Sequence, residues 1–492
     1  MNNGLPKGQQ LYEKVRNDFI GLNTQYKVAT GKTSTRVYLD SSATTLMMKV
    51  AHDVMEDFYK HYANTHSLLH FGAKISTREY DWAHRRILSF VKADPEVYTC
   101  FFTGSGTTAG MNRLARVLRD IRPDKDVAIV SIMEHHSNDL PHRKHMKKVD
   151  HIPLKSSNGK LGCVCLESRE KILQKNEGHV NYVAMTGVSN VTGIVNPINE
   201  AAEVAHRYGV LFIVDGAQLA SHVPVKMSVP ENPEQNIDAL VFSGHKTYVP
   251  GSPGAVIARK DLLEQIEPEE VGGGMVEDVF VDRYEVKKVF PDREEAGTPN
   301  IPGAVGLAAA VDVLDRISMK LLWDKETQLI NSALDQLMKI DGVVIYGETD
   351  TELCDRVASI SFNITGLDHG LVAAVLNDYF NVAVRNECFC AHPYVKEMIL
   401  DDLLDYVESV DMEDIEQVYH LKRGMVRASF ALYSTEEDVA TLISAVKDIA
   451  SRKDYYQSQY EVDNSKNYVH KSFYFDHTET FSVEDAISAL LS

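Results

Sequence analysis

The stretch NPINEAAEVAHRYGVLFIVDGAQ, residues 196–218, limits the possible folds more than any other part of the chain. Asn196 can cap a helix that has Pro197 at its first position and that ends at Gly209. The apolar run 210–214 that follows is too short for a helix and is typical of a buried strand. A helix that leads directly into a buried strand is the repeating unit of a parallel sheet with crossover helices, so we expect an α/β fold.

Other short apolar runs in the middle of the chain also end at polar residues. The segments NYVAMTGVSN, DALVFSGHK and GAVIARK predict further strands, because each apolar run is bounded by Gly, Asn or Asp. The carboxyl ends of parallel strands meet at one edge of a sheet, where open α/β sheets bind ligands. We therefore expect that edge to gather Asn190, Asp215, Gln218, Ser243, His245 and Lys246.

The pattern changes after about residue 315. Long amphipathic stretches such as KLLWDKETQLINSALDQLMKI alternate with short apolar runs such as RVASISFNI, which is typical of a smaller α+β domain. In the tail, Ser482 and Asp485 predict the start of a short helix. We divide the chain into an N-terminal segment 1–35, a large domain 36–314, a small C-terminal domain 315–450 with an acidic insert at 396–424, and a C-terminal extension 451–492.

The charge and the cysteine usage limit the partners and the compartment. With 51 Lys and Arg against 70 Asp and Glu, the net charge of −19 argues against nucleic acid as a partner. The sequence has no apolar run of about 18 residues, which argues against a membrane span. Six cysteines among 492 residues do not resemble a secreted disulfide framework, so we expect a cytoplasmic protein.

The segment TGSGTTAG, residues 103–110, follows the apolar stretch YTCFF and precedes a helical pattern. A turn of small residues that opens a helix can direct backbone N–H groups and the Thr107 and Thr108 hydroxyls toward an anion. A plain strand-to-helix turn is the alternative interpretation. The segment is not a nucleotide P-loop, because it lacks the lysine after the second glycine.

A lysine at the end of a buried strand, Lys246, is a candidate for a lowered pKa and for carbonyl chemistry, whereas the alternative is a solvated lysine on a turn. The anion-binding turn and Asp215 make the first interpretation stronger. Together they offer the three groups that pyridoxal phosphate (PLP) needs, namely a phosphate cradle, a counter-charge for the pyridinium nitrogen and an amine for the aldehyde. His135 and His136 do not predict a metal site, because no carboxylate or cysteine at ligand spacing completes one.

A series of motifs in a fixed order resembles a known family. They are YLDSSATT (38–45), GSGTTAGMN (104–112), MEHHSN (133–138), VSNVTG (188–193), VDGAQ (214–218), FSGHK (242–246), EAGTPN (295–300), VRNECFCAHP (384–393) and VRASFALYSTEEDV (426–439). Over roughly residues 36–450 the chain looks like the class V aminotransferase family of fold-type I PLP enzymes, and within it like the Suf-type cysteine desulfurases and selenocysteine lyases. The resemblance implies a large PLP-binding domain with a mainly parallel seven-stranded sheet, a smaller α+β domain and a homodimer.

The resemblance also implies roles for individual residues. Lys246 would hold PLP and move the Cα proton of the substrate, and Asp215 would pair with the pyridinium nitrogen. Gln218 would hydrogen-bond the phenolic oxygen, and His135 would stack on the ring and act as an acid or base. The phosphate would be bound by Thr107, Thr108, Ser243 and His245, with Thr298 from a second subunit. The substrate carboxylate would be bound by Asn190 and Arg427, with Arg385 beside them, and Asn190 would also contact the cofactor.

The stretch VRNECFCAHP carries the nucleophile that the resemblance implies. Cys390 lies five residues after Arg385 and is followed by Ala391, His392 and Pro393, as in the desulfurases. Its thiolate would take the sulfur of L-cysteine as a persulfide and leave L-alanine, and Arg385 and His392 are consistent with a lowered thiol pKa. For Cys388 two interpretations stay open, a packed apolar residue or a second thiol that relays the persulfide.

Some residues depart from the family pattern. Ala109 stands where a glutamate is usual, and Asn386 and Glu387 replace small residues before the thiol. The acidic insert is either a solvated helix or a docking face near the thiol loop, for example for a sulfur-acceptor protein. We therefore expect a PLP-dependent cysteine desulfurase. The alternatives are another class V enzyme (a selenocysteine lyase, C–S lyase, epimerase or aminotransferase) and a catalytically silent scaffold.

Overall fold

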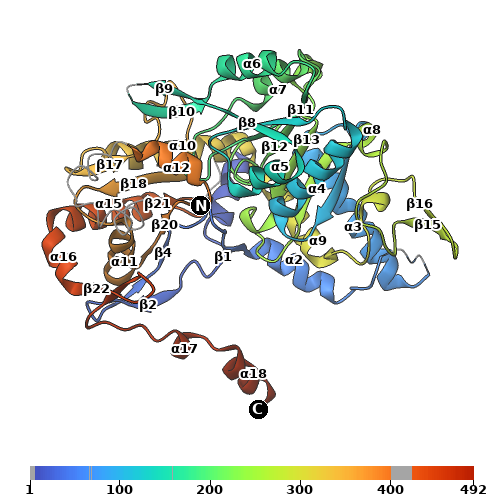
Figure 1. Ribbon diagram of the computed structural model, residues 1–492. Coiled ribbons are helices and arrows are strands. Elements are labelled where there is room, and N and C mark those ends of the chain that lie inside the picture. The colour runs from blue at the N-terminus through green and yellow to red at the C-terminus, as the bar shows by residue number, and fades with distance from the viewer. Residues whose placement is uncertain (1–5, 66, 68, 158, 401–423) are drawn as a thin grey trace.

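A seven-stranded sheet forms the centre of the larger part of the protein (Figure 1). The computed structural model describes residues 6–65, 67, 69–157, 159–400 and 424–492. Neighbouring strands follow the order β6-β14-β13-β12-β11-β7-β8, and only β14 runs antiparallel to its neighbours. The strands are β6 (Tyr98–Thr103), β7 (Val127–Ser131), β8 (Lys148–Ile152), β11 (Val180–Thr186), β12 (Leu211–Asp215), β13 (Ala239–Ser243) and β14 (Gly254–Arg259). The predicted α/β class with a mainly parallel seven-stranded sheet is confirmed.

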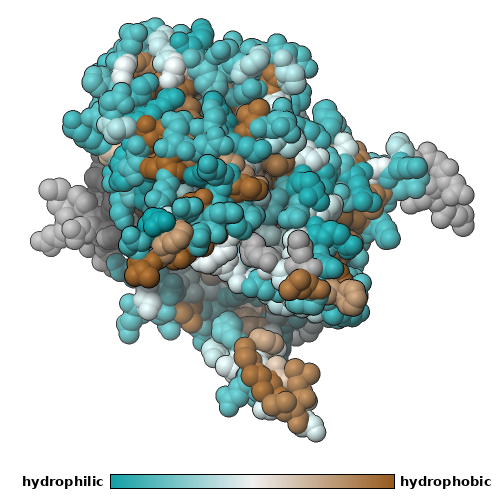
Figure 2. All heavy atoms as spheres, turned by 90° about the vertical axis from the view of Figure 1, so that its right-hand side faces the viewer, coloured by the Kyte–Doolittle hydropathy of each residue, from teal (hydrophilic) through white to brown (hydrophobic). Residues whose placement is uncertain are grey.

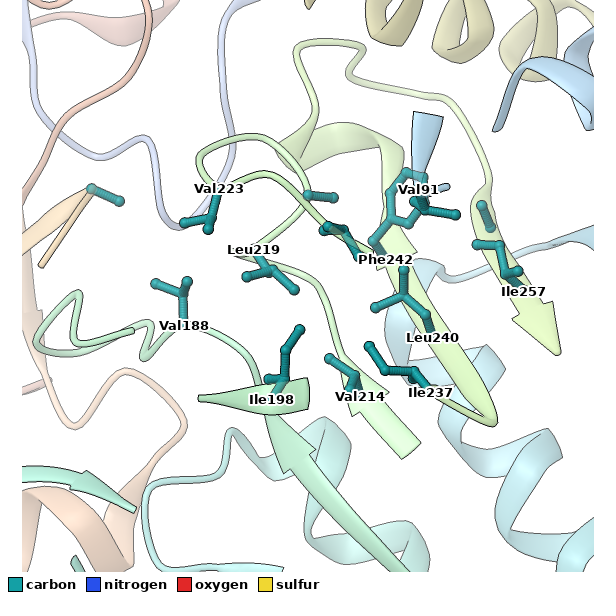
Figure 3. Close-up of a cluster of buried hydrophobic side chains, with 14 of the residues drawn as sticks. Val91, Val188, Ile198, Val214, Leu219, Val223, Ile237, Leu240, Phe242 and Ile257 are labelled. Atoms are coloured by element: carbon teal, nitrogen blue, oxygen red, sulfur yellow. The ribbon is translucent and has the colours of Figure 1, made fainter. Parts of the chain in front are cut away.

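Helices cover both faces of this sheet, because successive strand residues point to opposite sides. On β12, Ile213 belongs to a core with α4 (Gly106–Ile121), whereas Val214 belongs to the core on the other face. Figure 3 shows part of this second core, where Val214, Leu240 and Phe242 approach one another. The helices that contribute to the second core include α3 (Phe71–Phe90), α7 (Ile198–His206) and α9 (Ile301–Ile317). Because helices cover both faces of the sheet, the ends of its strands remain open for a ligand site.

The predicted helix and strand at 196–218 are present as α7 and β12, but the prediction that Asn196 caps the helix was wrong. Pro197 occupies the cap position of α7, and no side chain caps this end. The Asn196 side chain instead accepts a hydrogen bond from the Val164 N–H at 2.9 Å and donates one to the Thr186 carbonyl at 2.9 Å. A buried backbone N–H needs a partner, and here this need outweighs the capping preference of asparagine.

A four-stranded antiparallel sheet, in the order β17-β18-β21-β20, lies beside the large sheet (Figure 1). Its own hydrophobic core is shared with helices α10 (Met319–Leu337), α11 (His369–Phe380) and α15 (Glu436–Ser451). The strands are β17 (Val343–Ile345), β18 (Ser359–Ile364), β20 (Arg385–Glu387) and β21 (Met425–Ser429). This agrees with the α+β composition expected after residue 315. Leu39, from the start of the chain, also lies in this core, and the division into domains stays a prediction.

The C-terminal extension begins with α16 (Lys453–Gln459) and a hairpin of β22 (Tyr460–Val462) and β23 (Tyr468–His470). It then leaves the body of the protein as α17 (His477–Thr480) and α18 (Val483–Leu491), as Figure 1 shows. The Ser482 hydroxyl accepts a hydrogen bond from the Asp485 N–H at 3.3 Å, so the predicted helix start is confirmed. Apolar side chains gather on this projecting end (Figure 2).

Of the acidic insert at 396–424, the structure describes residues 396–400, which include the end of α12 (His392–Met398), and Gly424. The part between them, with most of the predicted insert helix, lies outside the described residues. Among the helices that the structure describes, none is both long enough and apolar enough to cross a membrane.

Candidate active site

A pocket of about 200 Å³ lies at the carboxyl ends of β12 and β13, as the strand-end pattern predicts. Its lining brings together residues from segments more than a hundred positions apart in the sequence. The predicted site residues that line it are Thr107, Thr108, His135, Asn190, Asp215, Gln218, Ser243, His245 and Lys246. Ser105, Ser137 and Thr186 add further hydroxyl groups to the lining.

Lys246 ends the short 3-10 turn that follows β13. Burial lowers the pKa of its ammonium group to about 8, and the positive charge of Arg427 acts in the same direction. The Asp215 carboxylate opposes this shift. At pH 7 about a tenth of Lys246 is therefore a neutral amine, which is the form that attacks an aldehyde.

Asp215, the last residue of β12, is only 2% exposed. Burial raises the pKa of its carboxyl group, although a hydrogen bond from the Ala217 N–H at 2.9 Å lowers it. A buried carboxylate gains stability when a cation enters the pocket beside it. The pocket therefore favours a ligand with a cationic nitrogen at Asp215.

The turn between β6 and α4 has the features of an anion site. No acidic residue lies in the first turn of α4, and the Ser105 side chain makes no capping hydrogen bond to this helix end, so the helix end keeps its positive character. Gly106 has φ +57°, and a Cβ there would lie 2.5 Å from the Ser243 Oγ. The Ser243 Oγ accepts a hydrogen bond from the Thr107 N–H at 2.8 Å, which ties the turn to β13. The Thr107 and Ser243 hydroxyl oxygens also lie 2.8 Å apart, and the lack of a side chain at Gly106 leaves the space for this contact.

The two histidines of the pocket are neutral. Burial and the Lys246 charge lower the pKa of His135 to about 3, and burial lowers that of His245 to about 4. The Ser137 N–H donates a hydrogen bond of 3.1 Å to the His135 Nδ1, so Nδ1 is an acceptor and the proton lies on Nε2. A neutral imidazole with one fixed tautomer can stack on a ring and donate from Nε2.

Behind His135 lies Glu134, a buried residue that the sequence analysis did not single out. Its carboxyl group accepts hydrogen bonds from the Ser131 hydroxyl, from the Asn138 Nδ2 at 2.6 Å and from the Thr186 N–H at 3.0 Å. Burial raises the pKa of Glu134 to about 8. This cluster ties the His135 turn to the end of β11. The only signal for it in the sequence is an acidic residue directly before the histidine pair.

Arg427 and Arg385 face each other across the β20–β21 ladder, and Asp40 lies between their guanidinium groups. The Asp40 carboxylate is 3.2 Å from the Arg427 Nη2 and 3.5 Å from the Arg385 Nη1. Arg427 also donates from Nη1 to the Asn190 carbonyl at 2.8 Å, and burial lowers its pKa to about 10. Within the described part of the chain, its buried Nε has no hydrogen-bond partner. Arg427 and Arg385 are not among the residues that line the pocket of Lys246, so their binding of a substrate carboxylate stays a prediction.

Cys390 is exposed and lies in a tight turn of residues 388–391. The Ala391 N–H donates to the Cys388 carbonyl at 2.8 Å, while Phe389 (φ +50°) and Cys390 (φ +55°) both adopt left-handed conformations. These are the hydrogen bond and the φ values of a type I′ turn, which glycine or asparagine usually occupies. Two such residues without glycine cost about 1–2 kcal/mol each. The surrounding structure must compensate for this cost.

Three contacts hold the turn against the site. The Asn190 Nδ2 donates to the Phe389 carbonyl at 2.8 Å, and the His136 N–H donates to the Cys390 carbonyl at 2.7 Å. The Arg427 guanidinium lies 4.7 Å from the centre of the Phe389 ring. The thiol is close enough to the pocket for Cys390 to influence the pKa of both Lys246 and Arg427. Asn190 thus uses its side-chain amide to position the thiol turn.

Comparisons with known proteins agree with this geometry. Residues 37–442 match the family described as aminotransferase class-V. The chain belongs to the aminotransferase class-V family. The chain is 33% identical over 427 residues to a probable cysteine desulfurase of Halalkalibacterium halodurans, which covers 85% of this chain and 94% of that protein.

Two solved structures of similar proteins extend the class-V assignment to three dimensions. The apo cysteine desulfurase of Thermococcus onnurineus superposes with a TM-score of 0.72 at 29% identity, covering 85% of this chain and 95% of that one. The Escherichia coli cysteine desulfurase CsdA, solved as an S-sulfonic acid, gives a TM-score of 0.68 at 28% identity over 85% and 95% of the two chains. Both belong to proteins named as cysteine desulfurases.

Class-V enzymes use PLP, and the pocket fits this cofactor in its donor set. Lys246 offers a neutral amine, Asp215 a buried carboxylate in need of a cation, and the α4 turn an anion cradle. Gln218 lines the same pocket, although its Nε2 donates to the Ser42 carbonyl at 2.7 Å. The pocket therefore offers one suitable group for each of the three charged or reactive ends of PLP.

Thr298 does not line this pocket. It is exposed, and its Oγ1 accepts a hydrogen bond of 3.3 Å from the Asn64 Nδ2. Its loop is anchored by Glu295, whose carboxylate accepts hydrogen bonds from the Phe102 N–H at 2.7 Å and the Tyr80 hydroxyl at 2.7 Å. That Thr298 reaches the phosphate site of a second subunit stays a prediction.

Proposed function

We propose that this chain is a PLP-dependent cysteine desulfurase, which takes the sulfur of L-cysteine as a persulfide on Cys390 and releases L-alanine. One observation carries the proposal beyond the family. An exposed thiol is held in a strained turn by Asn190 and His136, next to the pocket that contains Lys246. A class-V enzyme without sulfur chemistry has no need for a nucleophile at this place.

The residues of the pocket divide the work of binding. Thr107, Thr108, Ser243 and His245, with the first turn of α4, would hold the phosphate. Asp215 would bind the pyridinium nitrogen, Gln218 the phenolic oxygen, and His135 would stack on the ring. Bound PLP supplies an electron sink that stabilises negative charge at the substrate Cα. Arg427 would bind the substrate carboxylate through its Nε, with Arg385 and Asn190 beside it.

Two residues carry the chemistry. Lys246 would take the proton from the substrate Cα, because its lowered pKa allows it to act as a base near neutral pH. The Cys390 thiolate would then attack the substrate sulfur. A sulfur–sulfur bond forms and the carbon–sulfur bond of the substrate breaks. The substrate Cβ takes up a proton in place of the one that Cys390 has lost, and Lys246 returns the proton to Cα, which completes L-alanine.

The test measures L-alanine and sulfide from L-cysteine, with PLP-loaded enzyme and dithiothreitol. Cys390→Ala should lose L-alanine formation, whereas Cys165→Ala, which changes a partly exposed cysteine at the start of α6 (Leu166–Lys175), should not. The Lys246 attachment is tested by borohydride reduction and mass spectrometry of the Lys246 peptide. L-Alanine formation by Cys390→Ala at the wild-type rate would disprove the role of this thiol.

We also propose a homodimer in which Thr298 completes the partner's phosphate site, a cytoplasmic location, and a sulfur-acceptor protein as partner. The exposed position of Thr298, outside the pocket of its own chain, supports the first of these. Sedimentation analysis of the PLP-loaded chain tests it. If the PLP-loaded chain sediments as a monomer and its phosphate site is fully occupied, the shared phosphate site of the proposed homodimer is wrong.

A further inference from the structure

A second pocket, of about 410 Å³, lies behind the thiol turn. It shares no lining residue with the pocket that contains Lys246. One wall comes from α11 and β20, and another comes from residues 465–468, between β22 and β23 in the C-terminal extension. The volume lies in the range of sites for small ligands, about 300–1,000 Å³. A segment at the end of the chain thus closes a cavity next to the catalytic turn.

Cys388 lies in the wall of this second pocket and is only 4% exposed. It is the first residue of the turn whose third residue is Cys390. One turn thus carries both thiols: Cys388 lines the second pocket, and Cys390 is close enough to Lys246 to influence its pKa. Cysteines two residues apart rarely reach disulfide geometry without strain. A persulfide reaches about 2 Å further than a thiol, because a sulfur–sulfur bond has this length. Sulfur can therefore pass between thiols that are poorly placed for a disulfide.

The charged groups of the second pocket indicate which ligand it takes. Asp368 lines it, and the Asp368 Oδ1 accepts a hydrogen bond from the Gly370 N–H at 2.7 Å as the cap of α11. The Asp368 Oδ2 is buried and has no hydrogen-bond partner among the residues that the structure describes. Leaving a buried carboxylate oxygen without a donor costs about 1–3 kcal/mol. An ammonium group of a ligand would satisfy it. Glu387 adds a second negative charge to the lining and Lys466 one positive charge, so acidic groups outnumber basic ones among the Asp, Glu and Lys side chains of the pocket.

We propose that Cys388 is a second sulfur carrier, which takes the persulfide sulfur from Cys390 and passes it, in the second pocket, to a small thiol that bears an ammonium group. The proposal rests on the proposed function and deepens it. In the first step the Cys388 thiolate attacks the outer sulfur of the Cys390 persulfide. The Cys388 sulfur–sulfur bond forms, the Cys390 sulfur–sulfur bond breaks, and Cys390 takes up the proton that Cys388 has lost.

In the second step the thiolate of the small ligand attacks the outer sulfur of the Cys388 persulfide. The ligand leaves as its own persulfide, and Cys388 returns to a thiol. Both steps exchange one sulfur–sulfur bond for another, so no oxidant or reductant is consumed. The emptied Cys390 is then ready for another molecule of L-cysteine.

The first test locates the persulfide. The PLP-loaded full chain receives one equivalent of L-cysteine without a reductant, is alkylated, and the peptide with both cysteines is sequenced by mass spectrometry. We expect persulfide on Cys388 and on Cys390 in the wild type, on Cys390 alone in Cys388→Ala, and on neither residue in Cys390→Ala. Wild-type persulfide confined to Cys390 would overturn the relay, and so would persulfide on Cys388 in Cys390→Ala.

The second test concerns the ligand. The rate of sulfur transfer is measured with cysteamine, which has an ammonium group, and with 2-mercaptoethanol, which does not. Asp368→Asn removes the charge but keeps a cap residue of equal quality for α11. We expect the preference for cysteamine to fall about tenfold in this variant, as the loss of one charge-assisted hydrogen bond implies. An unchanged preference would overturn the ligand class.

The two levels of the proposal fail in different ways. If the wild type forms no L-alanine from one equivalent of L-cysteine, the proposed function is wrong. If L-alanine forms but the sulfur stays on Cys390, only the relay is wrong. Cys165→Ala serves as the matched control in both experiments, because Cys165 lines neither pocket.

Discussion

The lowered pKa of Lys246 predicts how the protein without cofactor captures PLP. Only the neutral amine reacts with an aldehyde, so the capture rate should follow the neutral fraction of Lys246. With a pKa of about 8 in place of the ordinary 10.5, the neutral fraction at pH 7 is about a tenth, about 300-fold more than for a solvated lysine. The rate should therefore rise about tenfold per pH unit below pH 8 and level off above it.

The assay mixes cofactor-free protein with PLP and follows the visible absorbance of the covalent product in a stopped-flow instrument. Asp215→Asn provides the matched control. Because the Asp215 carboxylate raises the pKa of Lys246, its removal should move the midpoint of the profile to lower pH. The comparison uses the pH midpoint and not the rate, because Asp215 would also bind PLP and its loss would change the rate for that reason alone. A profile without a midpoint near pH 8 would refute burial as the cause, and a midpoint that rises in Asp215→Asn would refute the coupling of the two groups.

Three other substitutions test separate parts of the structure. Arg427→Lys removes the planar donor group that meets the Asn190 carbonyl and Asp40, so the KM for L-cysteine should rise about tenfold or more in steady-state kinetics, with kcat affected less. In Glu134→Gln the side-chain amide N–H faces the Asn138 Nδ2, which is also a donor, so one buried hydrogen bond is lost. The free energy of unfolding in urea should therefore fall by about 2 kcal/mol. Ser318→Gly relieves a left-handed φ of +90° at an exposed site, and the free energy of unfolding should rise by about 1 kcal/mol. A KM that falls in Arg427→Lys, or a free energy of unfolding that rises in Glu134→Gln, would contradict the role of that contact. A free energy of unfolding that falls in Ser318→Gly would contradict the backbone strain at Ser318.

The residues at strand ends could be predicted from the sequence because their positions follow from local patterns. Asp215 and Lys246 each stand directly after a buried apolar run, and parallel strands bring such positions to one edge. The prediction for Asn196 failed for a physical reason. Its capping preference is local, whereas the unpaired Val164 N–H that it satisfies comes from a hairpin 32 positions earlier in the chain.

Asp40, Glu134 and the shape of the thiol turn could not be predicted in the same way. Asp40 acquires its place only when β20 and β21 bring Arg385 and Arg427 beside it, and these residues are hundreds of positions away in the sequence. The left-handed pair Phe389 and Cys390 contradicts the turn preferences of both residue types. Local preferences fail at such positions because contacts from elsewhere hold the backbone there.

The contacts of Arg427 connect substrate binding with the position of the thiol. The same guanidinium group reaches Asp40, the Asn190 carbonyl and the Phe389 ring, and the Asn190 amide holds the Phe389 carbonyl. In the proposed function a substrate carboxylate binds the Arg427 Nε. Its negative charge beside Asp40 should weaken the Asp40 contact and shift the guanidinium group that lies over the Phe389 ring. Since coupling between two binding events is reciprocal, the turn that presents Cys390 must in turn affect the affinity for the substrate carboxylate. Cys388 begins that turn, so under the proposed relay a sulfur passed to the second pocket and the next substrate at Arg427 would act on one shared element of the backbone.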